Sequence, residues 1–159
     1  MVSPSYIQSI ASALDAASRK VSSPIRFIAF DKDKDVEFHR AISKKMATDC
    51  SFSDVTVDTV ISELGAAEVV IAMRYHAGVV ATLAGRPSLL ISDSPKVKSL
   101  ASALGEACRI IPNEQSSFYL IPGLTEELWN KGSLVESSRR TSVSASKANH
   151  EMLGRITGC

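Results

Sequence analysis

The residues of this chain best suited to chemistry are His76 and Lys96, which lie twenty positions apart and each follow a short apolar run. Residues 69–73 lead toward His76, and residues 89–91 lead toward Lys96. An imidazole exchanges a proton near neutral pH, and a lysine ammonium binds anions. If both runs are parallel strands, their carboxyl ends meet at the edge where open α/β sheets bind ligands. We therefore expect both groups at one ligand-binding edge.

The segment from Arg74 to Ala77 is expected to turn from a strand into a helix. Backbone N–H groups at a helix start attract anions, and a guanidinium such as that of Arg74 matches a carboxylate or a phosphate. His76 is the candidate catalytic residue, and Arg74 and Ala77 are candidates for substrate binding. The alternative is that His76 only caps the helix.

Lys96 is predicted to lie in the first turn of the next helix, because Ser94 suits the N-cap and Pro95 the first helical position. The helix dipole disfavours a cation there, so the position indicates an anionic ligand that offsets it. Lys96 and Ser94 are thus candidates for substrate binding. The alternative is an ordinary surface lysine in solvent.

Two acidic residues are weaker candidates. Asp31 follows the predicted strand 25–30 among alternating lysines, and Glu114 follows the strand predicted at 108–111, on the expected ligand side. A solvated loop is the alternative for each of them. The sequence contains no Gly-x-Gly-x-x-Gly and no Walker motif, and its cysteines lack metal-site spacing, so we predict neither a cofactor nor a metal.

Composition is that of one ordinary globular domain: 159 residues, 45% hydrophobic, with a net charge of +1. Bulk charge gives no reason to expect a nucleic-acid partner. Three widely spaced cysteines favour reduced, intracellular thiols. The sequence has no long apolar run and no signal-peptide pattern, so we expect a cytoplasmic protein without a transmembrane segment.

The hydrophobic pattern alternates between helix and strand, which predicts an α/β fold with a Rossmann-like parallel sheet and helices on both faces. The chain opens on a helix, so we expect the first strand of the sheet to be missing. Residues 1–133 are predicted to form this domain, and residues 134–159 a polar helical tail. Expected helices are 5–20, 36–47 (capped by Asp35), 59–64 (capped by Asp58), 77–84, 95–104 and one from Thr125; expected strands are 25–30, 53–57, 69–73, 87–91 and 108–111.

Residues 73–101 read M-R-Y-H-A-G-V-V-A-T-L-A-G-R-P-S-L-L-I-S-D-S-P-K-V-K-S-L-A. This segment closely resembles the signature of the polysaccharide pyruvyl transferases, in which R-x-H-A, Gly-x-Pro and P-K-V recur in this order. Weaker similarity extends over about residues 5–111. By this resemblance His76 and Lys96 are the functional histidine and lysine of the family, and Arg74 is its motif arginine.

The resemblance implies a two-domain fold like that of GT-B glycosyltransferases, of which this chain is most of the C-terminal half. It further implies transfer of the enolpyruvyl unit of phosphoenolpyruvate, as co-substrate, to two hydroxyls of a sugar or lipid-linked saccharide in cell-wall or exopolysaccharide synthesis. The missing N-terminal domain is then a required partner.

Two other functions stay open at this point. One is a glycosyltransferase or a sugar-nucleotide epimerase of the same fold, in which Glu114 would hold a ribose. The other is an inactive truncated domain.

Overall fold

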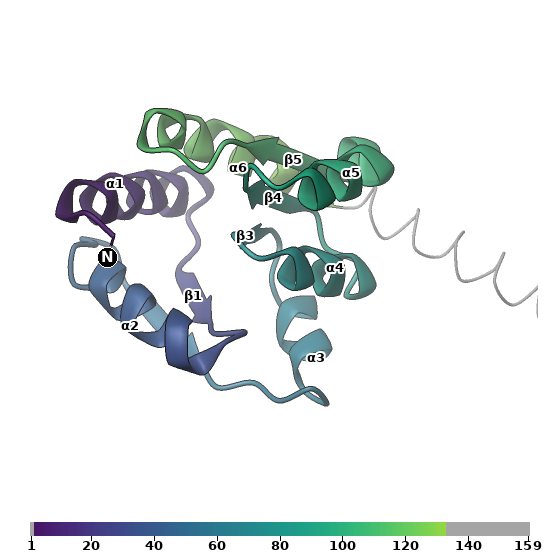
Figure 1. The fold of residues 1–159 in the computed structure, drawn as a ribbon, viewed down its shortest axis with the longest axis horizontal. Helices are drawn as coiled ribbons and strands as arrows, with labels where there is room; N and C mark the ends of the chain where they lie inside the picture. The colour runs from purple at the N-terminus through teal and green to yellow at the C-terminus, as the bar shows by residue number, and fades with distance from the viewer. Residues whose placement is uncertain (1, 133–159) are drawn as a thin grey trace, which may run out of the picture.

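The computed structural model describes residues 2–132, in which helices alternate with short strands (Figure 1). The predicted tail, 134–159, lies outside the described residues. The elements are α1 (Pro4–Val21), β1 (Ile25–Ile28), α2 (Lys32–Ser43), β2 (Cys50–Ser53), α3 (Val60–Gly65), β3 (Val70–Ala72), α4 (Tyr75–Leu83), β4 (Ser88–Ile91), α5 (Pro95–Leu104), a 3-10 turn (Gly105–Ala107), β5 (Cys108–Ile111), a second 3-10 turn (Gln115–Leu120) and α6 (Ile121–Asn130).

All strand pairs are parallel, as the alternation of helix and strand predicts, but the strands form two sheets rather than one. One sheet has the order β1-β2, with Ile25 opposite Cys50, and the other has the order β3-β4-β5. Figure 1 shows β1 standing apart from β3, on the side of α2. The described fold is therefore mixed α/β, and its strands are divided into two sheets that meet at β1 and β3 without pairing.

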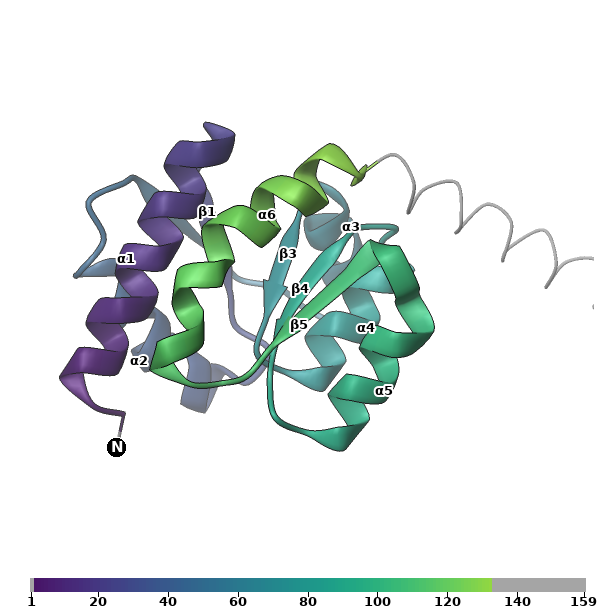
Figure 2. The same ribbon diagram turned by 90° about the horizontal axis from the view of Figure 1, so that it is seen from above.

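Helices cover both faces of the strands because the strand residues alternate between two apolar clusters. In β4, Leu89 and Ile91 pack in the cluster that holds α1 and α6, whereas Leu90 packs in the cluster that holds α4 and α5. All residues of β4 are buried, as expected for a strand covered on both faces. Figure 2 shows α1 and α6 side by side over one face.

Helix α2 begins four residues earlier than the sequence predicts. Its N-cap residue is Asp31, not Asp35. The Asp35 carboxylate instead accepts hydrogen bonds from the backbone N–H groups of Phe30 and Asp31, at 3.0 and 2.9 Å. The side chain thus reaches back over the helix start, as an acidic residue in the first turns of a helix often does.

Among the other elements, β2, α3 and α6 also differ from the predictions. Strand β2 occupies Cys50–Ser53 instead of 53–57, because its register is fixed by pairing with β1 rather than by local propensity. Helix α3 is capped at Thr59 rather than Asp58. Helix α6 begins before Pro122, which lies in its first turn and does not interrupt it, since no N–H is needed there.

Candidate active site

All the candidate residues follow the carboxyl ends of strands, and these ends lie at one edge of the molecule. Within each sheet the strands are parallel, and Arg74 after β3 bonds to Asp35, which is held against the end of β1. The two sheets therefore share this edge. It carries, from β1 to β5, Asp31, the junction Arg74–Ala77, the loop Ser92–Lys96 and Glu114.

His76 is exposed in the first turn of α4, which begins at Tyr75 and not at Ala77 as predicted. Its imidazole makes no hydrogen bond or ion pair with another described residue. Its ring lies edge-on to that of Tyr75, with 5.6 Å between centroids. The ring does not cap the helix, so it stays accessible to a ligand.

Lys96 is exposed in the first turn of α5, as predicted, and it has no ion pair within residues 2–132. Ser94 occupies the N-cap position, but its hydroxyl makes no capping bond. The hydroxyl of Ser92 instead accepts from the backbone N–H of Ser94, at 3.2 Å. The N-terminus of α5, like that of α4, has no side-chain cap, which leaves backbone donors for an anion.

Arg74 makes a two-pronged contact with Asp35. Its Nε donates to both carboxylate oxygens, at 2.9 and 3.0 Å, and its Nη2 donates to Oδ1 at 2.5 Å. Asp31 adds a longer ion pair, with 3.8 Å between Nη2 and Oδ2. The charge of Arg74 is therefore largely balanced by carboxylates, and Nη1 is the nitrogen left for a ligand.

The electrostatics of this pair favour the charged forms. Burial alone would raise the pKa of Asp35, but hydrogen bonds from Arg74 and from the backbone N–H groups of Asp31 and Phe30 outweigh it and lower that pKa. The hydrogen bond to Asp35 in turn raises the pKa of Arg74. The pair is ionised at neutral pH, and it joins β3 to α2 across the division between the sheets.

A family model for polysaccharide pyruvyl transferase matches residues 4–95, which is more than half of the 159 residues. The chain belongs to the polysaccharide pyruvyl transferase family. The matched range contains Arg74, His76, Ala77 and Ser94, and it ends at the residue before Lys96. Neither the curated proteins nor the solved structures gave a match.

The two acidic candidates of this pyruvyl transferase domain are both engaged locally. Asp31 forms an ion pair with Lys34 at 3.0 Å, and the hydrogen bond from that lysine is the main reason that its pKa is lowered. Glu114 is exposed, and one of its oxygens accepts from the hydroxyl of Ser117 at 3.2 Å. Its second oxygen has no partner in the part of the chain that the structure describes.

The sequence did not predict the polar contacts that hold the loops after β4 and β5 at this edge. Asn113 accepts from the Tyr6 hydroxyl at 2.5 Å, and its backbone N–H donates to Asp93 at 3.2 Å. Ser92 and Asp93 directly follow a buried strand, which is where short polar side chains fix a turn. The turn after β4 could therefore have been predicted from these residue types. The hydrogen bond from Tyr6, in α1, to Asn113 could not, because the two residues are far apart in the sequence.

Gly78, one turn into α4, is a place of close packing. A Cβ at this position would lie 2.9 Å from Cδ2 of Leu90 and 3.2 Å from Cδ2 of Leu100. The glycine therefore lets α4 lie close to β4, and the neighbour is protein rather than ligand.

Within residues 2–132, no group of three or more His, Cys, Asp or Glu side chains is placed to hold a metal ion. None of the helices in that range is long and apolar enough to cross a membrane.

Proposed function

We propose that this chain forms the phosphoenolpyruvate-binding side of a pyruvyl transferase active site. The observation that carries the proposal is the pair His76 and Lys96. Each is exposed and without an ionic partner among the described residues, in the first turn of a helix whose N-terminus has no side-chain cap. Both helices start at the same edge of the strands, and the family match covers this region up to residue 95.

Phosphoenolpyruvate carries a phosphate and a carboxylate, so its site needs several cationic or N–H donors. Lys96 and the N–H groups at the starts of α4 and α5 supply them in this proposal. Arg74 contributes less net charge than its type suggests, because Asp35 holds two of its nitrogens. Its Nη1 is the atom that we assign to the ligand.

His76 is the proposed proton carrier. A sugar hydroxyl adds to C2 of the enolpyruvyl group while a proton is delivered to the methylene carbon, which becomes a methyl group. A second hydroxyl then displaces phosphate from C2, and its proton leaves with the phosphate. An imidazole at the ligand serves one of these transfers, and Lys96 stabilises the departing phosphate.

The acceptor is proposed to be a sugar or a lipid-linked saccharide of a cell-wall or exopolysaccharide precursor. In a GT-B-like arrangement it binds between this domain and an N-terminal domain, which supplies the acceptor side of the cleft. The 159-residue chain alone is then expected to bind phosphoenolpyruvate without turning it over. No cofactor is required, because the leaving phosphate makes the donor reactive.

The test is a calorimetric titration of the chain with phosphoenolpyruvate, with inorganic phosphate and UDP-glucose as separate ligands. We expect saturable binding of phosphoenolpyruvate that is weakened in His76→Gln and Lys96→Met. Tyr75→Phe and Lys98→Met are matched controls, because both residues are exposed neighbours on the same helices. Binding that neither active-site variant changes would contradict the proposal.

Two other titration results would replace the proposed function with an alternative. Saturable binding of UDP-glucose with none of phosphoenolpyruvate would indicate a glycosyltransferase or an epimerase. Binding of none of the three ligands would favour an inactive domain.

A further inference from the structure

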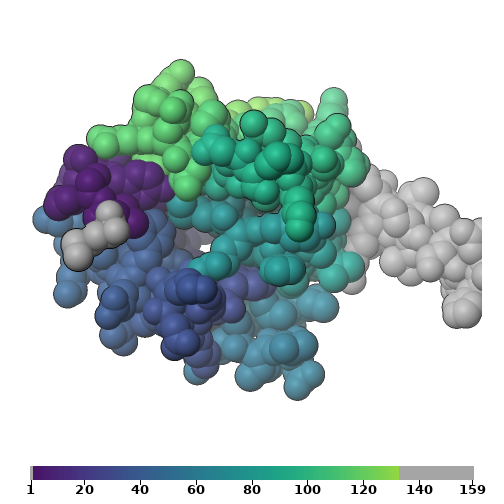
Figure 3. Space-filling view, viewed as in Figure 1, coloured from purple at the N-terminus to yellow at the C-terminus, as the bar shows by residue number. Residues whose placement is uncertain are grey.

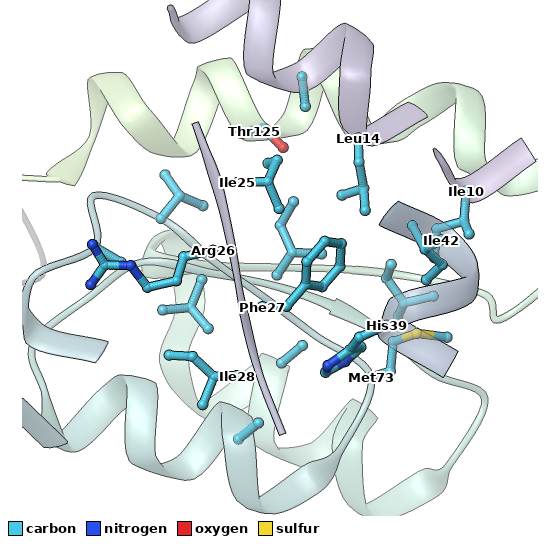
Figure 4. Close-up of a pocket in the computed structure, with 18 of the residues that line it drawn as sticks. Ile10, Leu14, Ile25, Arg26, Phe27, Ile28, His39, Ile42, Met73 and Thr125 are labelled. Atoms are coloured by element: carbon cyan, nitrogen blue, oxygen red, sulfur yellow. The ribbon is translucent and has the colours of Figure 1, made fainter. Parts of the chain in front are cut away.

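A groove of about 770 Å³ separates the two sheets. We call it the β1–β3 groove, because residues 25–28 of β1 line one wall and residues 69–74, around β3, line the other. Figure 4 shows β1 running along the groove, and Figure 3 shows the molecule hollowed between its N-terminal segments and the teal segments around β3. The groove therefore lies in the plane that a continuous sheet would occupy.

Each wall of the groove is a strand that is paired on one side only. Strand β1 is hydrogen-bonded to β2, and β3 is hydrogen-bonded to β4, but the two are not bonded to each other. Strands of this kind present a row of unpaired N–H and C=O groups along the free edge. Two such edges face each other here, which is the arrangement on both sides of an absent strand.

The two free edges also run in the same direction. At the carboxyl end, Asp35 accepts from the N–H of Phe30, which follows β1, and from Arg74, which follows β3. Any strand between them can therefore be parallel to both at once. The two edges do not pair with each other, and a strand placed between them could pair with both, since paired strands lie about 4.8 Å apart.

Helices above and below leave an apolar channel for such a strand. On one side the groove is lined by apolar residues of α1, including Ile10, Leu14 and Ala17. On the other side it is lined by Leu64, in α3, and Ala77, in α4. A strand covered on both faces is apolar at successive positions rather than at alternate ones. A strand in this groove should therefore have a continuous apolar sequence. Its expected length is about four or five residues, since each residue of a strand spans about 3.3 Å.

One polar atom in the wall independently marks the groove as unfilled. Thr125, in α6, is buried with 5% exposure, lines the groove, and its Oγ1 has no hydrogen-bond partner among the described residues (Figure 4). A buried hydroxyl without a hydrogen-bond partner destabilises the fold, so this position favours a neighbour that can form a hydrogen bond. An extended backbone beside it offers both donors and acceptors, which an acyl chain or another hydrocarbon does not.

The start of α1 lies at the correct end of the groove to receive the strand. Val2 lines the groove, and the Tyr6 hydroxyl bonds to Asn113, which follows β5 at the carboxyl edge. A strand that leaves the groove at that edge enters α1 directly. Helix α1 then returns the chain to β1, beside the inserted strand, in the right-handed crossover that parallel units adopt.

We propose that the β1–β3 groove is the seat of a parallel β-strand, formed by an apolar peptide segment that continues into Val2. The strand completes one sheet of order β2-β1-insert-β3-β4-β5. The direction of winding reverses at the inserted strand, so the crevice at its carboxyl end is a topological switch point, flanked by Asp31 and Arg74. This proposal does not depend on phosphoenolpyruvate as the donor.

The experiment extends the 159-residue chain and follows amide hydrogen exchange by mass spectrometry. The probe is Ser-Lys-Val-Val-Ile-Val-Ala placed directly before Val2, and the control is the same extension with proline in place of the first and third valine. The valine extension should slow exchange in both 25–28 and 70–72 by about tenfold or more, since those amides gain a partner strand. The proline extension should not, because it lacks the N–H groups that pair.

Each outcome decides the proposal. Protection of both β1 and β3, together with a higher melting temperature, supports it. Unchanged exchange at either strand, equal protection by the proline extension, or protection only at β2 or β5, which are the outer edges, would overturn it. A size-exclusion elution volume matching a monomer is required throughout, because self-association would also protect strand edges.

Discussion

Arg74, after β3, holds Asp35, in α2, by three hydrogen bonds that reach from one sheet to the elements of the other. The same carboxylate accepts two backbone N–H groups at the end of β1. This contact therefore links the two walls of the β1–β3 groove near their carboxyl ends. It also explains why a motif arginine at the candidate site is not free to act as an isolated cation.

Replacing Asp35 with Asn should destabilise the domain. The side chain of Asp35 is 14% exposed, and the change removes one charge from an ion pair and leaves Arg74 with only the longer ion pair to Asp31. Hydrogen bonds to charged groups contribute about 1.5–3 kcal/mol, so we expect a loss of that size in the free energy of unfolding, measured by urea denaturation. Asp33→Asn is the matched control, because Asp33 is exposed on the same helix turn.

The Arg74–Asp35 pair also predicts a pH dependence. The pKa of Asp35 is lower in the folded chain than in the unfolded one, so its contribution to stability is fully present above the unfolded value, about 3.9. It is lost as the pH falls below that value through the folded pKa. The difference in unfolding free energy between wild type and Asp35→Asn should therefore shrink over the range in which the pH falls below about 4. A difference that stays constant over this range would contradict the prediction.

Lys96→Met should weaken phosphoenolpyruvate binding about ten- to hundredfold, since a charge-assisted bond to phosphate is lost. Lys98→Met changes the same formal charge two residues further along α5, so it should change the dissociation constant much less. Isothermal titration at low and at physiological salt measures both. Equal losses in the two variants would mean that the surface charge of the helix, and not a contact from Lys96, attracts the ligand.

His76→Gln should affect turnover more than affinity, because the proposal gives the imidazole a proton-transfer role. In an enzyme with both halves of the cleft, phosphate release should fall about 10²- to 10⁴-fold. Tyr75→Phe keeps the ring that lies against His76 and should leave the rate near that of the wild type. If His76→Gln raises the Michaelis constant alone, the histidine binds the donor and carries no proton.

The sequence predicted well those elements that local signals define. Helix α5 and strand β5 have the predicted bounds, because Pro95 opens the helix, Gly105 closes it at φ 56°, and an apolar run bounded by polar residues follows. The exposed positions of His76 and Lys96 were also predictable, since each follows a buried strand. The polysaccharide pyruvyl transferase family was identified from residues 73–101, which contain both of these residues.

Contacts between distant segments could not be predicted in this way. The sequence indicated parallel strands but not their division into two sheets, because whether β1 and β3 pair depends on what lies between them. The bond from Arg74 to Asp35 spans 39 positions and overrides the local expectation that Asp35 caps its own helix. The missing first strand and the GT-B-like arrangement stay predictions, and the extension experiment tests the first of them.

Asp15, in α1, should stabilise the fold by binding α1 to the segment that follows α2. It is 5% exposed and accepts from the N–H groups of Ala47 and Thr48 and from the Thr48 hydroxyl, at 2.8, 3.0 and 2.6 Å. Asp15→Ala leaves these donors without an acceptor, so the free energy of unfolding should fall by about 1–3 kcal/mol. Asp49→Asn, at an exposed position nearby, should leave urea unfolding unchanged. Equal midpoints for all three proteins would show that water replaces the carboxylate.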